Sequence, residues 1–184
     1  MAVYTKLSKH NIEQLLNQYD IGELCDFQEI SSGIENTNYF VITQLPDKAS
    51  TRWVLTLFEN LKASDLPYFC DLTIHLEQDG FKVPAPLKNY QGEYVFTLKN
   101  KAGVLVPCLL GSSLVTPDAI NCASVGAYLA GMHLSLRSFS QNRAVQRDLT
   151  WMQVQQEKLQ AVMLQEEFKI LISYQRIFDI HFCI

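Results

Sequence analysis

The sequence is poor in charge and contains no run of charges of one sign. Only 18% of its 184 residues are charged, with 15 basic and 19 acidic side chains and a net charge of −4, against about a quarter charged in a typical domain. Without a cluster of Lys or Arg it lacks the basic face of a nucleic-acid-binding protein. No apolar run approaches the roughly 18 residues of a membrane span, and the first ten residues lack a signal peptide's apolar core. We therefore expect a cytoplasmic protein with neither a nucleic-acid nor a membrane partner.

Spacings typical of metal centres, disulfide frameworks and phosphate-binding glycine motifs are also missing. The five cysteines include no CxxC pair, and the four histidines are scattered, so we expect reduced thiols and no metal site. The eight glycines form neither GxxxxGK[ST] nor GxGxxG, which excludes the two best-known nucleotide fingerprints.

The hydrophobic content of 48% is enough for a real core, and its pattern changes along the chain. Helical spacing follows Ser8, and β-branched and aromatic residues then predict strands over 24–30, 37–43 and 52–58. Asp65 and Pro67 begin a helix that Gly80 ends. Residues 94–98 and 103–109 read as a hairpin, and a break at 111–113 precedes helices only, beginning near 116 and 150 and including 168–174. This order predicts two parts, residues 1–110 and 111–184.

Two segments could bind a ligand. The loop SSGIENTN (31–38) has small residues whose successive N–H groups can form an anion-binding nest, with side-chain donors from Asn36 and Asn38. The apolar strand through Val106 and Cys108 could offer backbone groups to a flat heterocycle. Each segment alone also fits a plain hairpin loop or an edge strand.

Taken together, these segments suggest a family. SSGIENTNYFVIT, RWVLTLFE, DLPYF, GFKVPAP, GVLVPCLLG, NCASVGAYLAGMHL and RDLTWM occur in this order. The chain resembles the homoserine kinases of the choline-kinase-like, aminoglycoside phosphotransferase superfamily, and GIENTNYFV is the most specific piece. The resemblance implies an α+β fold: a protein-kinase-like N-lobe with a five-stranded antiparallel sheet and one helix, followed by the first helices of an incomplete helical C-lobe.

The resemblance also implies ATP with Mg²⁺ as cofactor, L-homoserine as acceptor and a role in threonine biosynthesis. The residues it places at the nucleotide are Ser32, Gly33, Asn36, Thr37, Asn38, Thr56, Val106 and Cys108. Among them Thr56 takes the third-strand position where many members of the superfamily have Lys or Arg, and residues 106–108 form the hinge that meets adenine.

The family's catalytic loop, a His-Ala-Asp-Leu-Phe run, and its later metal-binding aspartate do not occur in the sequence. His181 stands where the loop would begin, without an aspartate after it. We therefore expect no catalytic and no metal-binding residue here, and an inactive truncated form of the enzyme.

Two other functions stay open at this point. One is a kinase of the same superfamily with another hydroxyl acceptor, such as choline, methylthioribose or an aminoglycoside. The other is a non-catalytic nucleotide-binding fragment. The sequence does not decide the oligomeric state.

Overall fold

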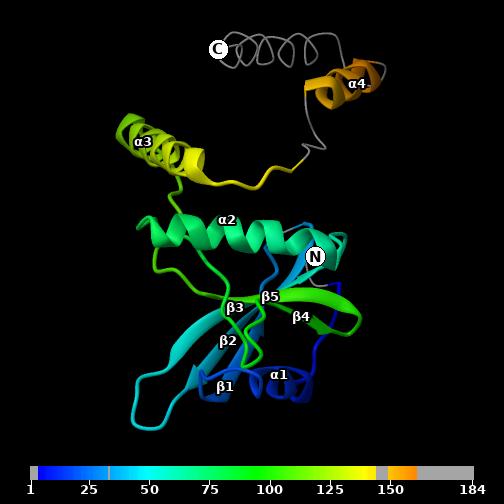
Figure 1. Ribbon diagram of the computed structural model, residues 1–184, viewed down its shortest axis with the longest axis vertical. Helices are drawn as coiled ribbons and strands as arrows, with labels where there is room; N and C mark the ends of the chain where they lie inside the picture. Colours follow the sequence, from blue (N-terminus) through cyan, green and yellow to red (C-terminus); the bar gives the residue numbers. More distant parts are fainter. Residues whose placement is uncertain (1–3, 33, 144–148, 161–184) are drawn as a thin grey trace. The chain divides into compact units, whose positions relative to one another are not determined.

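Five strands form one antiparallel sheet in the order β1-β2-β3-β5-β4 (Figure 1). The computed structural model describes residues 4–32, 34–143 and 149–160. The strands are β1 (Glu23–Glu29), β2 (Asn36–Gln44), β3 (Thr51–Phe58), β4 (Val95–Leu98) and β5 (Lys101–Pro107). The helices are α1 (Lys9–Leu16), α2 (Leu66–Gln78), α3 (Ala119–Ser135) and α4 (Leu149–Gln160), with short 3₁₀ turns η1 (Ala63–Asp65) and η2 (Leu136–Ser138). The predicted sheet and its single long helix are confirmed.

The main core lies between α1 and one face of the sheet. Every second residue of β2 is buried, beginning with Thr37, as expected when one face of a strand packs and the other does not. α1 begins at a capping box, in which Ser8 and Asn11 each bond the other's backbone N–H. The buried residues of this core that α1 and the three central strands contribute are Ile12, Leu15, Leu16, Tyr39, Val41, Leu55, Leu57 and Leu105.

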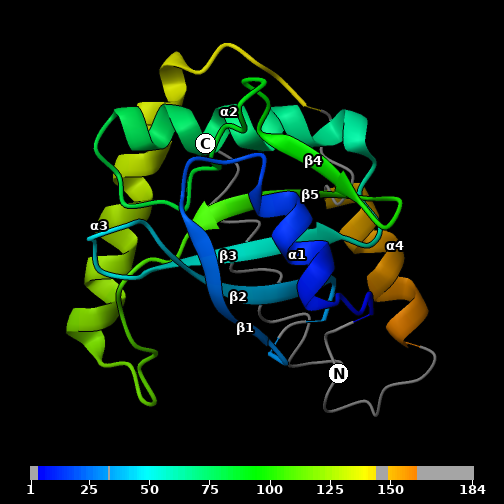
Figure 2. The ribbon, with the colours of Figure 1, turned by 90° about the horizontal axis from the view of Figure 1, so that it is seen from below.

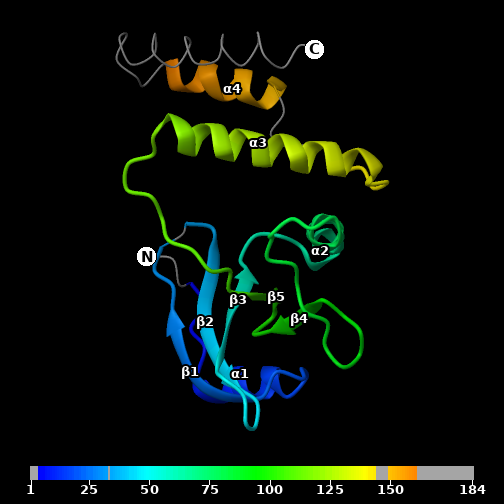
Figure 3. The same ribbon diagram turned by 90° about the vertical axis from the view of Figure 1, so that its left-hand side faces the viewer.

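The opposite face of the sheet carries α2 (Figures 1 and 3). Its first turn contains Pro67, where a missing N–H costs no helical hydrogen bond. Its buried residues are Leu66, Cys70 and Leu76, which recur at helical spacing on one side. α1 and α2 therefore cover different faces of the sheet (Figures 1 and 2).

A two-residue turn joins β4 to β5. Lys99 and Asn100 both have positive φ, 51° and 60°, the backbone of a type I′ turn, whose twist matches that of a hairpin. β5 thus begins at Lys101, two residues before the predicted start, and it pairs with β4 through Leu98 opposite Lys101.

In the described residues after the sheet, all the regular secondary structure is helical. α3 begins at Asp118, which forms a capping box with Asn121. Its 17 residues include no Asp, Glu, Lys or Arg, and none is buried. Its large exposed side chains are Ile120, Val125, Tyr128, Leu129 and Leu134, as in a helix that packs on several sides in a complete protein.

The chain divides into two compact units, residues 1–141 and 142–184. The described residues between 111 and 160 contain no strand, and the helix expected over 168–174 lies outside them. The lobe boundary near residue 110 stays a prediction. Over the described ranges, no helix is both long and apolar enough to cross a membrane.

The contact between β4 and β5 gives a direct test of the fold. A Cβ added at Gly103 would lie 2.6 Å from the ring of Phe96 and 2.6 Å from the carbonyl oxygen of Thr56. Gly103→Ala should therefore lower the free energy of unfolding by about 1–3 kcal/mol, the usual cost of overpacking, measured by urea denaturation.

The matched control is Gly126→Ala in α3, where an added Cβ meets nothing within 4 Å. Because alanine favours a helix over glycine by about 0.5–1 kcal/mol, this variant should not be destabilised. Equal stability of the two variants would contradict the β4–β5 packing.

Candidate functional site

Four of the predicted site residues come together on the α2 face of the sheet. Asn36 and Asn38 alternate with the buried residues of β2, and Thr56 of β3 lies directly opposite Asn38. The Thr56 hydroxyl donates to Asn38 Oδ1 at 2.8 Å. Val106 of β5 pairs with Val54 on the same face. All of these side chains are half-buried, so the face is reachable by a ligand.

Polar and apolar side chains alternate along this face of β3: Arg52 lies at the hinge end, Thr56 pairs with Asn38 and Val104, and Phe58 pairs with Asn36 at the loop end. Val54 and Val106 stand near the hinge, while Thr56 and Asn38 stand towards the β1–β2 loop. From Trp53, opposite the end of β5, to Phe58, opposite the start of β2, the strand extends about 17 Å at its usual rise. A ligand with a flat apolar part and a polar part fits a face on which the Asn38–Thr56 pair lies next to Val54 and Val106.

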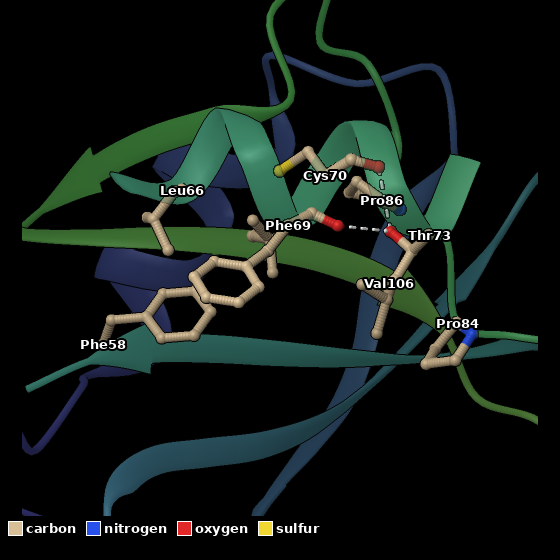
Figure 4. A pocket seen from close by; sticks show the side chains of 9 residues that line it. Phe58, Leu66, Phe69, Cys70, Thr73, Pro84, Pro86 and Val106 are labelled. Carbon is tan, nitrogen blue, oxygen red and sulfur yellow. Dashed lines mark hydrogen bonds between the residues drawn. The ribbon is translucent and has the colours of Figure 1, made fainter. Parts of the chain in front are cut away.

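An apolar cavity lies beside this strip, between α2 and β5 (Figure 4). Its volume is about 160 Å³. The residues that line it are Phe58, Leu66, Phe69, Cys70, Thr73, Pro84, Pro86, Val104 and Val106. The Thr73 hydroxyl donates to the carbonyl oxygens of Phe69 and Cys70 within its own helix (Figure 4), so the cavity wall carries little free polarity.

At the hinge, the backbone N–H of Cys108 is already bonded within the sheet. The Cys108 N–H donates to the carbonyl oxygen of Arg52 at 3.1 Å, which continues the ladder between β3 and β5 past Pro107. That N–H is therefore engaged within the sheet. The chain then leaves the sheet at Leu109, an exposed residue that the sequence analysis did not include.

Thr37 lies apart from the other predicted site residues. Its side chain faces the α1 side and is fully buried. Its hydroxyl accepts from the N–H groups of Tyr4 and Thr5 and donates to Glu59 Oε1 at 2.7 Å. This side chain holds the start of β2 in place and does not face the ligand side.

Ser32 is exposed in the β1–β2 loop, and Gly33 lies outside the described residues. The base of the loop is closed by the Ile30 N–H, which donates to the carbonyl oxygen of Asn38 at 2.9 Å. Within the part of the chain that the structure describes, no three His, Cys, Asp or Glu side chains are grouped as metal ligands.

Glu59 is a residue that the sequence analysis missed. Its carboxylate, with 12% of the side chain exposed, accepts from Thr37 and Thr5 and lies 3.0 Å from Lys101 Nζ. Burial raises the pKa of Glu59, but the hydrogen bonds from Thr37, Thr5 and Lys101, with the charge of Lys101, outweigh it and hold the pKa below its usual range. The Lys101 ammonium lies on the α1 side of the sheet, bound to Glu59. It therefore does not take the place of the Lys or Arg that the family resemblance leads one to look for on the third strand.

The Glu59–Lys101 pair should make the free energy of unfolding depend on pH in the acid range. A carboxyl whose folded pKa is depressed stabilises the fold above its unfolded pKa, about 4.5, and loses that contribution as the pH falls through the lower folded value. Glu59→Gln should cost about 1–3 kcal/mol at pH 7, because Lys101 loses its charged partner and keeps only the Glu59 carbonyl oxygen. It should also flatten the loss of stability below pH 4.5, as followed by urea denaturation.

The control is Glu13→Gln, which breaks an exposed pair with Lys9 and should cost no more than about 0.5 kcal/mol. Equal costs in the two variants, or an unchanged acid limb in Glu59→Gln, would contradict the role given to the buried carboxylate.

A five-stranded antiparallel sheet with one long helix on the side of the loop and hinge defines a kinase-like fold. A similar fold is found in the structure of amicoumacin kinase hAmiN in complex with AMP-PNP, Ca²⁺ and Ami, with a TM-score of 0.60 over 97% of this chain and 55% of that one, at 13% identity. The model of the phosphotransferase enzyme family (APH) matches residues 26–170. The chain belongs to this family.

Curated relatives named homoserine kinase are more similar in sequence. The one from Methylobacillus flagellatus is 40% identical over 97% of this chain and 56% of its own length. The one from Methylobacillus glycogenes is 47% identical over 76% of this chain and 42% of its own length. The chain thus spans about half the length of these relatives.

Proposed function

We propose that this chain carries the nucleotide-binding half of an ATP-dependent homoserine kinase, which converts ATP and L-homoserine to ADP and O-phospho-L-homoserine in threonine biosynthesis. The observation that carries this proposal is the hydrogen-bonded Asn38–Thr56 pair, which lies next to Val54 and Val106 on the α2 face between hinge and loop. Membership of the phosphotransferase family and the relatives named homoserine kinase support the reaction and the acceptor. A cytoplasmic location goes with this proposal.

In the proposed arrangement, adenine lies at the hinge end of the face. Val54 and Val106 supply the apolar surface there, and the backbone at Cys108 and Leu109 supplies hydrogen-bonding groups. A nucleotide cofactor fits this end, because a flat heterocycle needs apolar contact and few polar partners.

The phosphates lie at the loop end. Asn36 and Asn38 offer amide groups, and the Thr56 hydroxyl fixes the orientation of the Asn38 amide by donating to its oxygen, which leaves the NH₂ group to face a phosphate. Ser32, Gly33 and the backbone at Thr37 complete the proposed loop site. Mg²⁺ bound with ATP would neutralise phosphate charge, and the described residues offer no cluster of ligands for it.

Phosphoryl transfer also needs a group that orients the acceptor hydroxyl and ligands for the metal. The sequence contains neither the His-Ala-Asp-Leu-Phe run nor the later aspartate that the family resemblance places in these roles. We therefore expect no release of ADP by residues 1–184 with ATP and L-homoserine, in a coupled assay.

A chimera tests the nucleotide half directly. Residues 1–184 are joined to the remaining half of the Methylobacillus flagellatus relative, which is 40% identical over the shared part. The chimera should phosphorylate L-homoserine, and Thr56→Val within it should raise KM for ATP about tenfold through the lost hydrogen bond, with KM for homoserine unchanged.

The matched control is Thr97→Val in β4, an exposed position on the far edge of the sheet. Equal effects of the two threonine substitutions on KM for ATP would refute the assignment of the α2 face. Turnover by residues 1–184 comparable to that of the chimera would refute the proposal that this half binds the nucleotide and the other half supplies the catalytic groups.

A further inference from the structure

An N-terminal arm, defined here as residues 4–7, crosses the start of β2. The N–H groups of Tyr4 and Thr5 donate to Thr37 Oγ1 at 2.9 and 3.0 Å. The Leu7 N–H donates to the Tyr39 hydroxyl at 3.0 Å. In Figure 3 the first described residues of the chain accordingly lie near the loop between β1 and β2.

The tip of this arm holds the loop itself. The Tyr4 hydroxyl donates to the carbonyl oxygen of Ile34 at 2.8 Å. The side chains of Tyr4 and Ile34 are 57% and 85% exposed, so this contact is not a by-product of core packing. The Tyr4 side chain extends from the arm to the loop, and its hydroxyl hydrogen bond holds the loop there.

The base of the arm is firmly attached. The Thr5 hydroxyl donates to Glu59 Oε1 at 2.8 Å, the same oxygen that accepts from Thr37. Glu59 in turn pairs with Lys101. Charge-assisted hydrogen bonds of this kind are the stronger ones in a protein. They fix the arm, and with it Tyr4, in place relative to β2, β3 and β5.

The direction of the Ile34 carbonyl matters to an anion in the loop. A carbonyl oxygen carries negative partial charge and repels a phosphate that approaches it. The Tyr4 hydroxyl occupies the Ile34 carbonyl oxygen, and the Tyr4 backbone is anchored on Thr37, whose side chain lies on the opposite face from Asn36 and Asn38. A carbonyl engaged in this way is less available to turn towards a phosphate at the two asparagines. A loop already held in this conformation pays less ordering entropy when phosphate binds.

We propose that the arm is a positioning element for the phosphate loop and that Tyr4 is its positioning residue. The proposal rests on the proposed function, because it assigns the loop to phosphate. Tyr4 acts through the position of Ile34 and contributes to the binding of phosphate, and it has no part in binding the base.

The test compares Tyr4→Phe with Tyr90→Phe in residues 1–184. Tyr90 is a similarly exposed tyrosine, 66%, that lies outside the arm and the loop. Amide hydrogen exchange of residues 31–36 is measured without ligand. NMR titration then gives Kd for Mg-ADP and for adenosine, and the midpoint of thermal unfolding reports on overall stability.

Tyr4→Phe should speed exchange in the loop and weaken Mg-ADP binding about three- to tenfold, the usual worth of one hydrogen bond. Adenosine binding and the unfolding midpoint should not change, because neither depends on the loop. Tyr90→Phe should behave as the unsubstituted chain. A purely structural role for Tyr4 would instead lower the unfolding midpoint and affect both ligands alike, and this result would overturn the proposal.

Unchanged exchange at residues 31–36 in Tyr4→Phe would also overturn the proposal, even if the nucleotide binds normally. Failure of the unsubstituted chain to bind either ligand would refute the proposed function and, with it, the phosphate role of the arm. Faster exchange confined to Tyr4→Phe would in that case still establish that Tyr4 holds the loop.

Discussion

The packing of α1 against every second residue of β2 and β3 is the constraint on which the rest of the structure depends. Because side chains alternate along a strand, burying Tyr39 and Leu55 on one face sends Asn38 and Thr56 to the other. A shift of register by one residue would exchange the two sets. The core on the α1 side therefore decides which side chains the loop and hinge can present to a ligand.

Thr37 connects this core to the loop. It occupies a buried position of β2, yet its hydroxyl bonds the N-terminal arm and Glu59, and Glu59 bonds the first residue of β5. Three segments that are distant in the sequence are thus joined where β2 begins. This polar junction is partly buried and held by several hydrogen bonds, which makes a rigid base for a loop of small residues.

The strands, α2 and the starts of α3 and α4 could be predicted from the sequence, because periodicity and capping residues are local signals. The bond from Thr56 to Asn38 could not, since it depends on the register of β2 and β3. For the same reason Glu59 and Lys101 were missed: they are 42 residues apart and meet only through the sheet. The face that the Thr37 side chain occupies could not be predicted from its nearness in sequence to Asn36 and Asn38, because it too depends on how the strand packs.

The central claim is that the α2 face of the sheet binds the nucleotide and the α1 face does not. Methyl NMR during titration of residues 1–184 with Mg-ADP measures both faces at once. The largest changes in methyl chemical shift should occur at Val54 and Val106, and the methyl shifts of Val41 and Leu57 should change little. Shifts as large at Val41 and Leu57, or none at Val54 and Val106, would contradict this claim.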